Sequence, residues 1–328
     1  MAFVVNGAEW RFDGWSRTDI INSIEKVLDR IMVARERNEK IWIGDDFQTR
    51  PMLDVQDLWG LFFSEDSILL PRELGHEVAA WLARAPRYAD ENLPEGMLEA
   101  IEIGVDTEPQ EVNIDLAWAH HNVRTGFAVA CLGITRSGIH KTKSSIAEVP
   151  VHWVHDETSN RCFWRDAIDV EHDSAETLER LSSHAFPDLY FPPGVWHGLN
   201  DLSNGYLPLR IEIRKYLAVL NDYGYWIFTF PPPALDPNDT VEHDVNAHPT
   251  NQIIERRFSG FNVTMAPEKP DVRSSELSRA AREITVEGRV LYCEWHGKLE
   301  GHQNRLHIHP PIPESDDKVV IAIFHKHL

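Results

Sequence analysis

The chain has 328 residues, of which 42% are hydrophobic and 26% are charged. This length is typical of about two domains, and the composition is that of a folded globular protein rather than a long disordered one. The 52 acidic residues outnumber the 32 basic residues and give a formal charge of −20. A charge of this sign excludes a protein that coats DNA over its whole surface.

The negative charge is concentrated in one part of the chain. Residues 1–244 hold 41 acidic and 21 basic residues, whereas residues 245–328 hold 11 of each and 7 of the 17 histidines. The electrostatic objection to nucleic-acid binding therefore applies to the first part only. We expect the acidic part to restrain the protein or to dock a protein partner.

The cysteines and the apolar runs indicate the compartment. Cys131, Cys162 and Cys293 have no short spacing, which excludes a disulfide framework and a zinc ribbon. The first residues lack the pattern of a signal peptide, and no apolar run is long enough to span a membrane. We therefore expect a cytoplasmic protein with no membrane partner. No glycine-rich phosphate loop is present, so we expect no cofactor.

The first 235 residues predict a mixed α/β domain. Asn6-Gly7 between two short apolar stretches predicts a hairpin, and Ser16 predicts the cap of a helix that runs to about Asn38. Apolar spacing and helix-end signals predict further helices over Asp54–Phe63, Arg72–Ala85, Ala175–Ser183 and Leu209–Leu220, and one through Arg124 that either Asn113 or Asp115 can cap. Short apolar runs predict strands over Lys40–Ile43, Ile101–Val105, Phe127–Ile134, Val149–Val154, Cys162–Trp164 and Trp226–Phe230.

A proline-rich segment predicts the domain boundary. Pro231-Pro232-Pro233 is followed by the polar run 236–239, and both are typical of a linker. We therefore expect an acidic domain over residues 1–235, a linker over 236–248 and a small domain over 249–328. The predicted fold class is α+β, with an N-terminal mixed α/β domain and a C-terminal helix plus antiparallel sheet.

The last 80 residues concentrate histidines and cations on predicted strands. A helix over Ser274–Ile284 precedes strands over Arg289–Trp295, Arg305–His309 and Lys318–Phe324. The two-residue period of a strand places Arg305, His307 and His309 on one face, and antiparallel pairing can bring them near the histidines of the last strand.

This combination suits RNA cleavage without a metal. Histidine titrates near neutral pH and can remove a proton from the 2′-hydroxyl or give one to the leaving oxygen, while cations stabilise the charged phosphorane. We assign proton transfer to His307, His309 and His325. We assign phosphate binding to the cations Lys298, Arg305 and Lys326.

The same segment resembles the RelE/ParE family of bacterial toxins. The resemblance covers roughly the last 80 residues. It lies in the order of a helix, a strand, a Lys298-Leu299 turn, the strand 304–308 with Arg305, and an apolar strand that ends in a His/Lys cluster. It implies a toxin-like or defence-associated bacterial protein that acts on RNA or on the ribosome. Family members are usually small and strongly basic, whereas this segment is neutral and follows an acidic domain.

Three alternatives remain open at this level. The chain can be a non-enzymatic interaction protein whose acidic domain binds a basic partner. The His-x-His pairs at 307/309 and 325/327 can chelate a transition metal. Histidines on a sheet face can also be solvated positions without a function.

Overall fold

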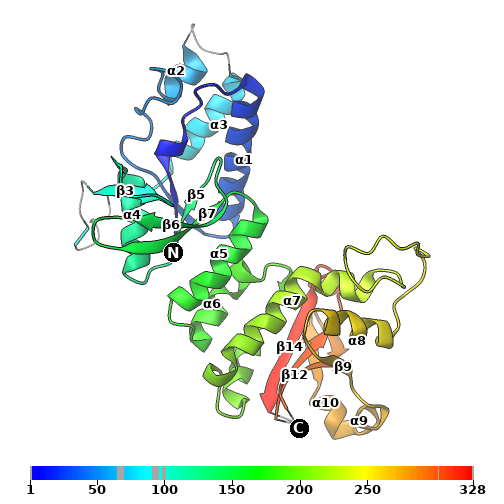
Figure 1. Cartoon of the computed structure of the whole chain (residues 1–328). Helices are drawn as coiled ribbons and strands as arrows, with labels where there is room; N and C mark the ends of the chain where they lie inside the picture. The colour runs from blue at the N-terminus through cyan, green and yellow to red at the C-terminus, as the bar shows by residue number, and fades with distance from the viewer. Residues whose placement is uncertain (1, 65–69, 91–95, 98–100, 302, 327–328) are drawn as a thin grey trace. The chain divides into compact units, whose positions relative to one another are not determined.

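The computed structural model describes residues 2–64, 70–90, 96–97, 101–301 and 303–326. Contacts between Cα atoms divide the chain into two compact units, Met1–His172 and Asp173–Leu328. A large mixed sheet belongs to the first unit and a separate, largely antiparallel sheet to the second (Figure 1). The predicted α+β class is therefore confirmed.

Unit 1 is built around a seven-stranded sheet with the order β2-β1-β5-β7-β6-β3-β4. The first four strands in this order run parallel, and the last three pair antiparallel. The strands are β1 (Ala2–Val5), β2 (Lys40–Trp42), β3 (Glu102–Val105), β4 (Glu111–Val112), β5 (Val129–Leu132), β6 (Gly138–Lys143) and β7 (Glu148–Val154). The central parallel strands are continuous apolar runs because helices cover them on both faces.

The helices described in unit 1 are α1 (Arg17–Glu36), α2 (Leu58–Phe63), α3 (Arg72–Leu82), α4 (Ile114–Arg124) and α5 (Glu157–Val170). Four of these five helices lie in predicted helical segments, and α5 does not. The Ser16 side chain accepts a hydrogen bond from the backbone N–H of Asp19 and so caps α1, as its place in the sequence predicts. Asn113 caps α4 in the same way.

Two local predictions in unit 1 are wrong. No hairpin forms at Asn6-Gly7, because β1 pairs in parallel with β2 and β5, and Gly7–Glu9 forms a short 3₁₀ helix (η1). Cys162–Trp164 is not a strand but part of α5, where Phe163 and Trp164 are buried on one face. Short apolar runs fit both element types, and tertiary packing decides between them.

Unit 2 carries helices against a five-stranded sheet with the order β8-β14-β13-β12-β9. Its helices are α6 (Ala175–Ala185), α7 (Arg210–Thr229), α8 (Asn251–Gly260), α9 (Pro270–Ser274) and α10 (Glu276–Ala280). Its strands are β8 (Leu189–Tyr190), β9 (Met265–Pro267), β10 (Glu283–Val286), β11 (Arg289–Tyr292), β12 (Trp295–Glu300), β13 (Asn304–His309) and β14 (Val319–Lys326). The predicted strand 226–230 is instead the last part of α7, and the predicted helix 274–284 divides into two short helices and β10.

The structure divides the chain earlier than the proline-rich segment predicts. Residues 236–248 form an exposed loop inside unit 2, between α7 and α8. The buried guanidinium of Arg257 on α8 donates to the carbonyl oxygens of Ile227, Phe230, Pro231 and Ala234 at 2.9–3.2 Å. These bonds fasten the C-terminal end of α7 and the proline run to α8, so the segment does not separate two units.

Close packing places α7 on the sheet. Tyr216 of α7 hydrogen-bonds through its hydroxyl to the backbone of Thr264 and Lys298. Gly297 of β12 leaves space for this ring, since an added Cβ would lie 2.5 Å from the Cε1 of Tyr216. The pairing of β13 with β14 shifts by one residue between His307 and Ile308, which leaves Ala322 of β14 as a bulge.

Candidate functional site

Strand register brings the predicted site residues of unit 2 together. His296 lies opposite His307, Lys298 lies opposite Arg305, and Arg305 lies opposite His325 on the next strand. Because alternate residues share a face, these five side chains point to the same side of the sheet. They line one cavity of about 440 Å³. The structure thus joins Lys298, Arg305, His307 and His325 and adds His296.

The three histidines form a row across β12, β13 and β14. The ring centroids of His296 and His307 are 5.5 Å apart, and those of His307 and His325 are 4.9 Å apart. The second pair is stacked, with an angle of 19° between the planes. Imidazoles at these distances disfavour each other's protonation, because a second positive charge would lie close by.

His307 is held as a neutral imidazole at the centre of this row. Its side chain is 1% exposed, and its Nδ1 lies 3.0 Å from the carbonyl oxygen of Cys293. Since a carbonyl only accepts, Nδ1 carries the proton and Nε2 keeps a lone pair. The pKa of His307 is lowered to about 3; burial is the largest cause, the hydrogen bond to Cys293 opposes it, and the charges of the neighbouring histidines and Arg282 add to the lowering.

Glu268, directly after β9, supplies the carboxylate of the cavity. Its Oε1 accepts a hydrogen bond from Nε of Arg282 at 2.8 Å and lies 3.7 Å from Nδ1 of His296 and 4.0 Å from Nε2 of His307. Burial lowers the pKa of His296, and the negative charge of Glu268 opposes this shift. His296 is therefore a base whose strength depends on the Glu268 carboxylate.

Cations outnumber carboxylates around the cavity. The charged lining residues are Lys269, Arg282, Lys298, Arg305, Glu268 and Asp271. Arg305 is buried, and its Nη1 donates to the carbonyl oxygens of Glu300 and Asn304 at 3.3 and 3.1 Å. Lys298 is exposed and reaches solvent at the rim. The excess of positive charge favours an anion, in a segment whose overall charge is zero.

One predicted site residue, His309, does not join the cavity, and the side chain of a second, Lys326, is not placed by the structure. His309 is half-buried, donates from Nδ1 to the carbonyl oxygen of Pro310 at 2.8 Å, and is not a lining residue. The hairpin of β10 and β11 is the physical reason, because its Val286 and Leu291 pack against Val320 and Ala322 at this end of the sheet. Lys326 ends β14 opposite Asn304, and its side chain lies outside the described part of the chain.

The sequence analysis missed Glu268 and Arg282 and left His296 out of the site. The position of His296, two residues before Lys298 on one strand, is a signal that could have included it. Glu268 and Arg282 carry no comparable local signal, because β9 meets β12 only through long-range pairing. Among the described residues, no group of three or more His, Cys, Asp or Glu side chains is arranged to hold a metal ion. His327, which belongs to one of the two His-x-His pairs of the metal-binding alternative, lies outside the described residues.

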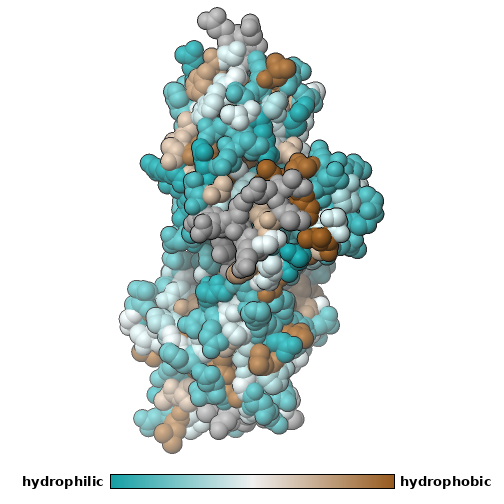
Figure 2. Space-filling view, turned by 90° about the vertical axis from the view of Figure 1, so that its left-hand side faces the viewer, coloured by the Kyte–Doolittle hydropathy of each residue, from teal (hydrophilic) through white to brown (hydrophobic). Residues whose placement is uncertain are grey.

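Comparison with known proteins gives no relative: no family model, no curated protein and no solved structure matches the chain. Among the residues that the structure describes, none of the helices combines the length and apolar character that crossing a membrane requires. The face in Figure 2 is mainly hydrophilic, with its hydrophobic residues in small separate groups. The residues that line the cavities are therefore the features that indicate a function.

Proposed function

We propose that unit 2 binds RNA in the cavity beside β12, β13 and β14 and cleaves it without a metal ion, in the manner of a RelE/ParE-like toxin. The observation that supports this proposal is the convergence of three histidines, two carboxylates and a larger number of cations around one cavity. A fixed set of cations stabilises a phosphodiester and, still more, the dianionic phosphorane. One imidazole in its neutral form accepts a proton, and a second imidazole in its protonated form gives one up.

The geometry suggests a role for each group. Neutral His296, beside Glu268, takes the proton of the 2′-hydroxyl as the 2′-oxygen attacks phosphorus. The bond from phosphorus to the 5′-oxygen breaks, and His325 at the other end of the row gives that oxygen a proton. The products are a 2′,3′-cyclic phosphate and a 5′-hydroxyl. Lys298 and Arg305 hold the phosphate, and buried His307 positions the two outer imidazoles.

A cleavage assay with the full chain tests this proposal. A labelled single-stranded RNA in the presence of EDTA is expected to give 2′,3′-cyclic phosphate ends. The double variant His296→Ala/Lys298→Ala is expected to lose at least about a hundredfold in rate, because removing one proton-transfer group alone typically costs that much. Lys215→Ala on α7, a half-buried lysine outside the cavity, is the matched control and is expected to cleave normally.

Two results would overturn the proposal. One is full activity of the double variant. The other is that the full chain neither binds nor cleaves RNA, whether or not ribosomes are present. In the second case, the function to test is the binding of a basic protein partner by the acidic residues 1–244.

A further inference from the structure

Unit 1 holds a second cavity, of about 510 Å³, beside the start of η1. Asn6 and Glu9 follow the carboxyl end of β1, which lies between β2 and β5 and runs parallel to both. After β1 the chain continues to β2 on one side of it, and β5, which comes later in the sequence, lies on its other side. In open α/β sheets the crevice at the carboxyl ends of such strands is where small ligands bind.

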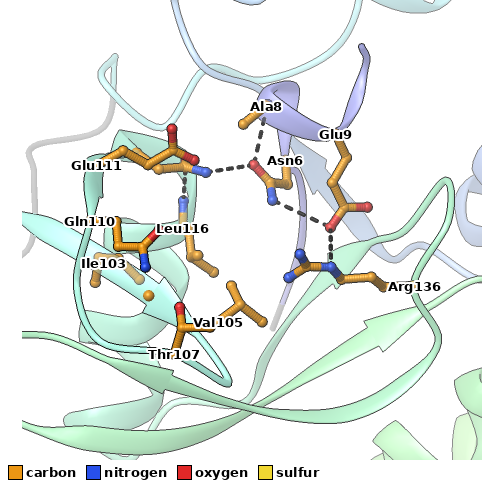
Figure 3. A pocket seen from close by; sticks show the side chains of 12 residues that line it. Asn6, Ala8, Glu9, Ile103, Val105, Thr107, Gln110, Glu111, Leu116 and Arg136 are labelled. Atoms are coloured by element: carbon orange, nitrogen blue, oxygen red, sulfur yellow. Dashed lines mark hydrogen bonds and ion pairs between the residues drawn. The ribbon is translucent and has the colours of Figure 1, made fainter. Parts of the chain in front are cut away.

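One wall of this cavity is polar and rigidly held (Figure 3). The Glu9 side chain is 9% exposed. Its carboxylate accepts hydrogen bonds from the indole N–H of Trp153 and from the backbone N–H of Ile134, the latter at 3.3 Å. The Nε of Arg136 lies 3.9 Å away. Asn6 donates to Glu9 and accepts from the Asn113 amide at 2.9 Å. A carboxylate has about four acceptor positions, so Glu9 retains capacity for a ligand donor.

Apolar side chains lie among the polar ones in the rest of the lining. They are Ile103 and Val105 of β3 and Leu116 of α4, and Figure 3 shows Ile103 and Leu116 on the far side from Glu9 and Arg136. Thr107 and Gln110, in the segment between β3 and β4, are exposed. A cavity that offers apolar side chains beside hydrogen-bonding ones fits a flat ring that has apolar faces and a hydrogen-bonding edge. Its volume lies in the range of small-molecule sites.

We infer that this cavity binds a nucleoside. The faces of the base lie against Ile103, Val105 and Leu116, and ring N–H groups at the base edge donate to Glu9. The sugar hydroxyls meet Thr107 and Gln110 at the rim. Two carboxylates, Glu9 and Glu111, face one guanidinium, Arg136, among the lining residues. This balance disfavours a phosphate, so the ligand is an uncharged nucleoside rather than a nucleotide.

Calorimetric titration of the full chain with guanosine, adenosine, cytidine and uridine tests this inference. At least one nucleoside is expected to bind. Free ribose lacks the base that donates to Glu9 and is expected to bind at least about tenfold more weakly, since a charge-assisted hydrogen bond is worth that factor. The 5′-monophosphate is also expected to bind more weakly, because Glu9 and Glu111 repel its phosphate. Glu9→Gln is expected to weaken binding by a similar factor. Glu25→Gln on the exposed face of α1 is the matched control and is expected to leave binding unchanged.

Several outcomes would overturn the inference. They are no binding of any nucleoside at millimolar concentration, tighter binding of the monophosphate, or an unchanged affinity in Glu9→Gln. If circular dichroism shows that Glu9→Gln is unfolded, the exposed residue Gln110 provides a second variant. Gln110→Ala is expected to bind the nucleoside several-fold more weakly, and an unchanged affinity would contradict the site. Lys298→Ala is expected to bind the nucleoside normally, which separates this result from the proposed RNA site.

Discussion

The imidazoles of His307 and His325 stack with their centroids 4.9 Å apart, although His325 is the Cα partner of Arg305 rather than of His307. The contact is therefore diagonal across β13 and β14, a distance that ring side chains can bridge. It extends the directly opposed pair His296 and His307 into a row of three rings. Four predictions follow from this row and from the packing that holds it.

Acid is expected to destabilise unit 2 partly through His307. Its pKa is about 3 in the folded protein and near 6.5 in an unfolded chain, so the unfolded state binds more protons between these values. The free energy of unfolding then falls as the pH is lowered from 6.5 toward 3, by up to about 1.4 kcal/mol per pH unit from this residue. Urea unfolding of the wild type and of His307→Gln at several pH values measures the two slopes. A His307→Gln slope equal to that of the wild type contradicts the prediction.

Removing the charge of Glu268 is expected to lower the pKa of His296. Burial already lowers this pKa, and the Glu268 carboxylate at 3.7 Å is the group that opposes the shift. In Glu268→Gln the opposing charge is absent, so His296 should titrate at lower pH. Histidine NMR signals followed against pH give the value. Glu283→Gln, which loses an ion pair with Arg279 outside the cavity, is the control. An unchanged or higher pKa of His296 in Glu268→Gln would refute the assigned role.

Arg257→Met is expected to destabilise unit 2 strongly. Four carbonyl oxygens accept hydrogen bonds of 2.9–3.2 Å from this buried guanidinium, and methionine satisfies none of them. Breaking such a buried charged network costs at least about 3 kcal/mol. Denaturant unfolding measures the loss, and Arg256→Met, at the exposed neighbouring position of α8, is expected to change stability by less than about 0.5 kcal/mol. Similar values for the two variants would show that the network is not required.

Gly297→Ala is expected to separate α7 from the sheet. The new Cβ would lie 2.5 Å from the Cε1 of Tyr216 and 2.8 Å from the Sδ of Met265, so the ring or the helix must move. Overpacking of this kind typically costs about 1–3 kcal/mol. Gly301→Ala is the matched control, because an added Cβ there meets no atom within 4 Å. Thermal unfolding of both variants measures the difference, and an equal Tm for the two would contradict this account of Gly297.

The sequence predicted best the elements whose ends carry a local signal. Ser16 caps a helix where expected, and Asn113 caps another at one of the two positions that the sequence left open, because capping depends on residues three positions apart. The apolar run 226–230 predicted a strand wrongly, because periodicity cannot separate a short strand from the end of a helix. Asn6-Gly7 predicted a hairpin wrongly, because a turn signal does not show whether the strands on either side of it pair with each other.

The candidate site was predictable to the extent that it lies within strands. The alternation of side chains along a strand predicts that Arg305 and His307 share one face, and the register of β12 with β13 agrees with this. Glu268 and Arg282 were not predicted because they reach the cavity through pairing and packing between distant segments. His309 was included wrongly because alternation says nothing of the hairpin that covers that end of the sheet.

The bulge at Ala322 makes the length of β14 more important than most of its side chains. On one side of the bulge Ile323 and His325 share a face with His307, and on the other side Val320 shares that face through its pairing with His309. A strand of the same length without the bulge would turn His325 away from the row or turn Val320 away from its apolar neighbours. Deletion of Ala322 removes only the extra residue and is expected to keep both faces in place, whereas a deletion or insertion elsewhere in β14 is expected to turn one of them over.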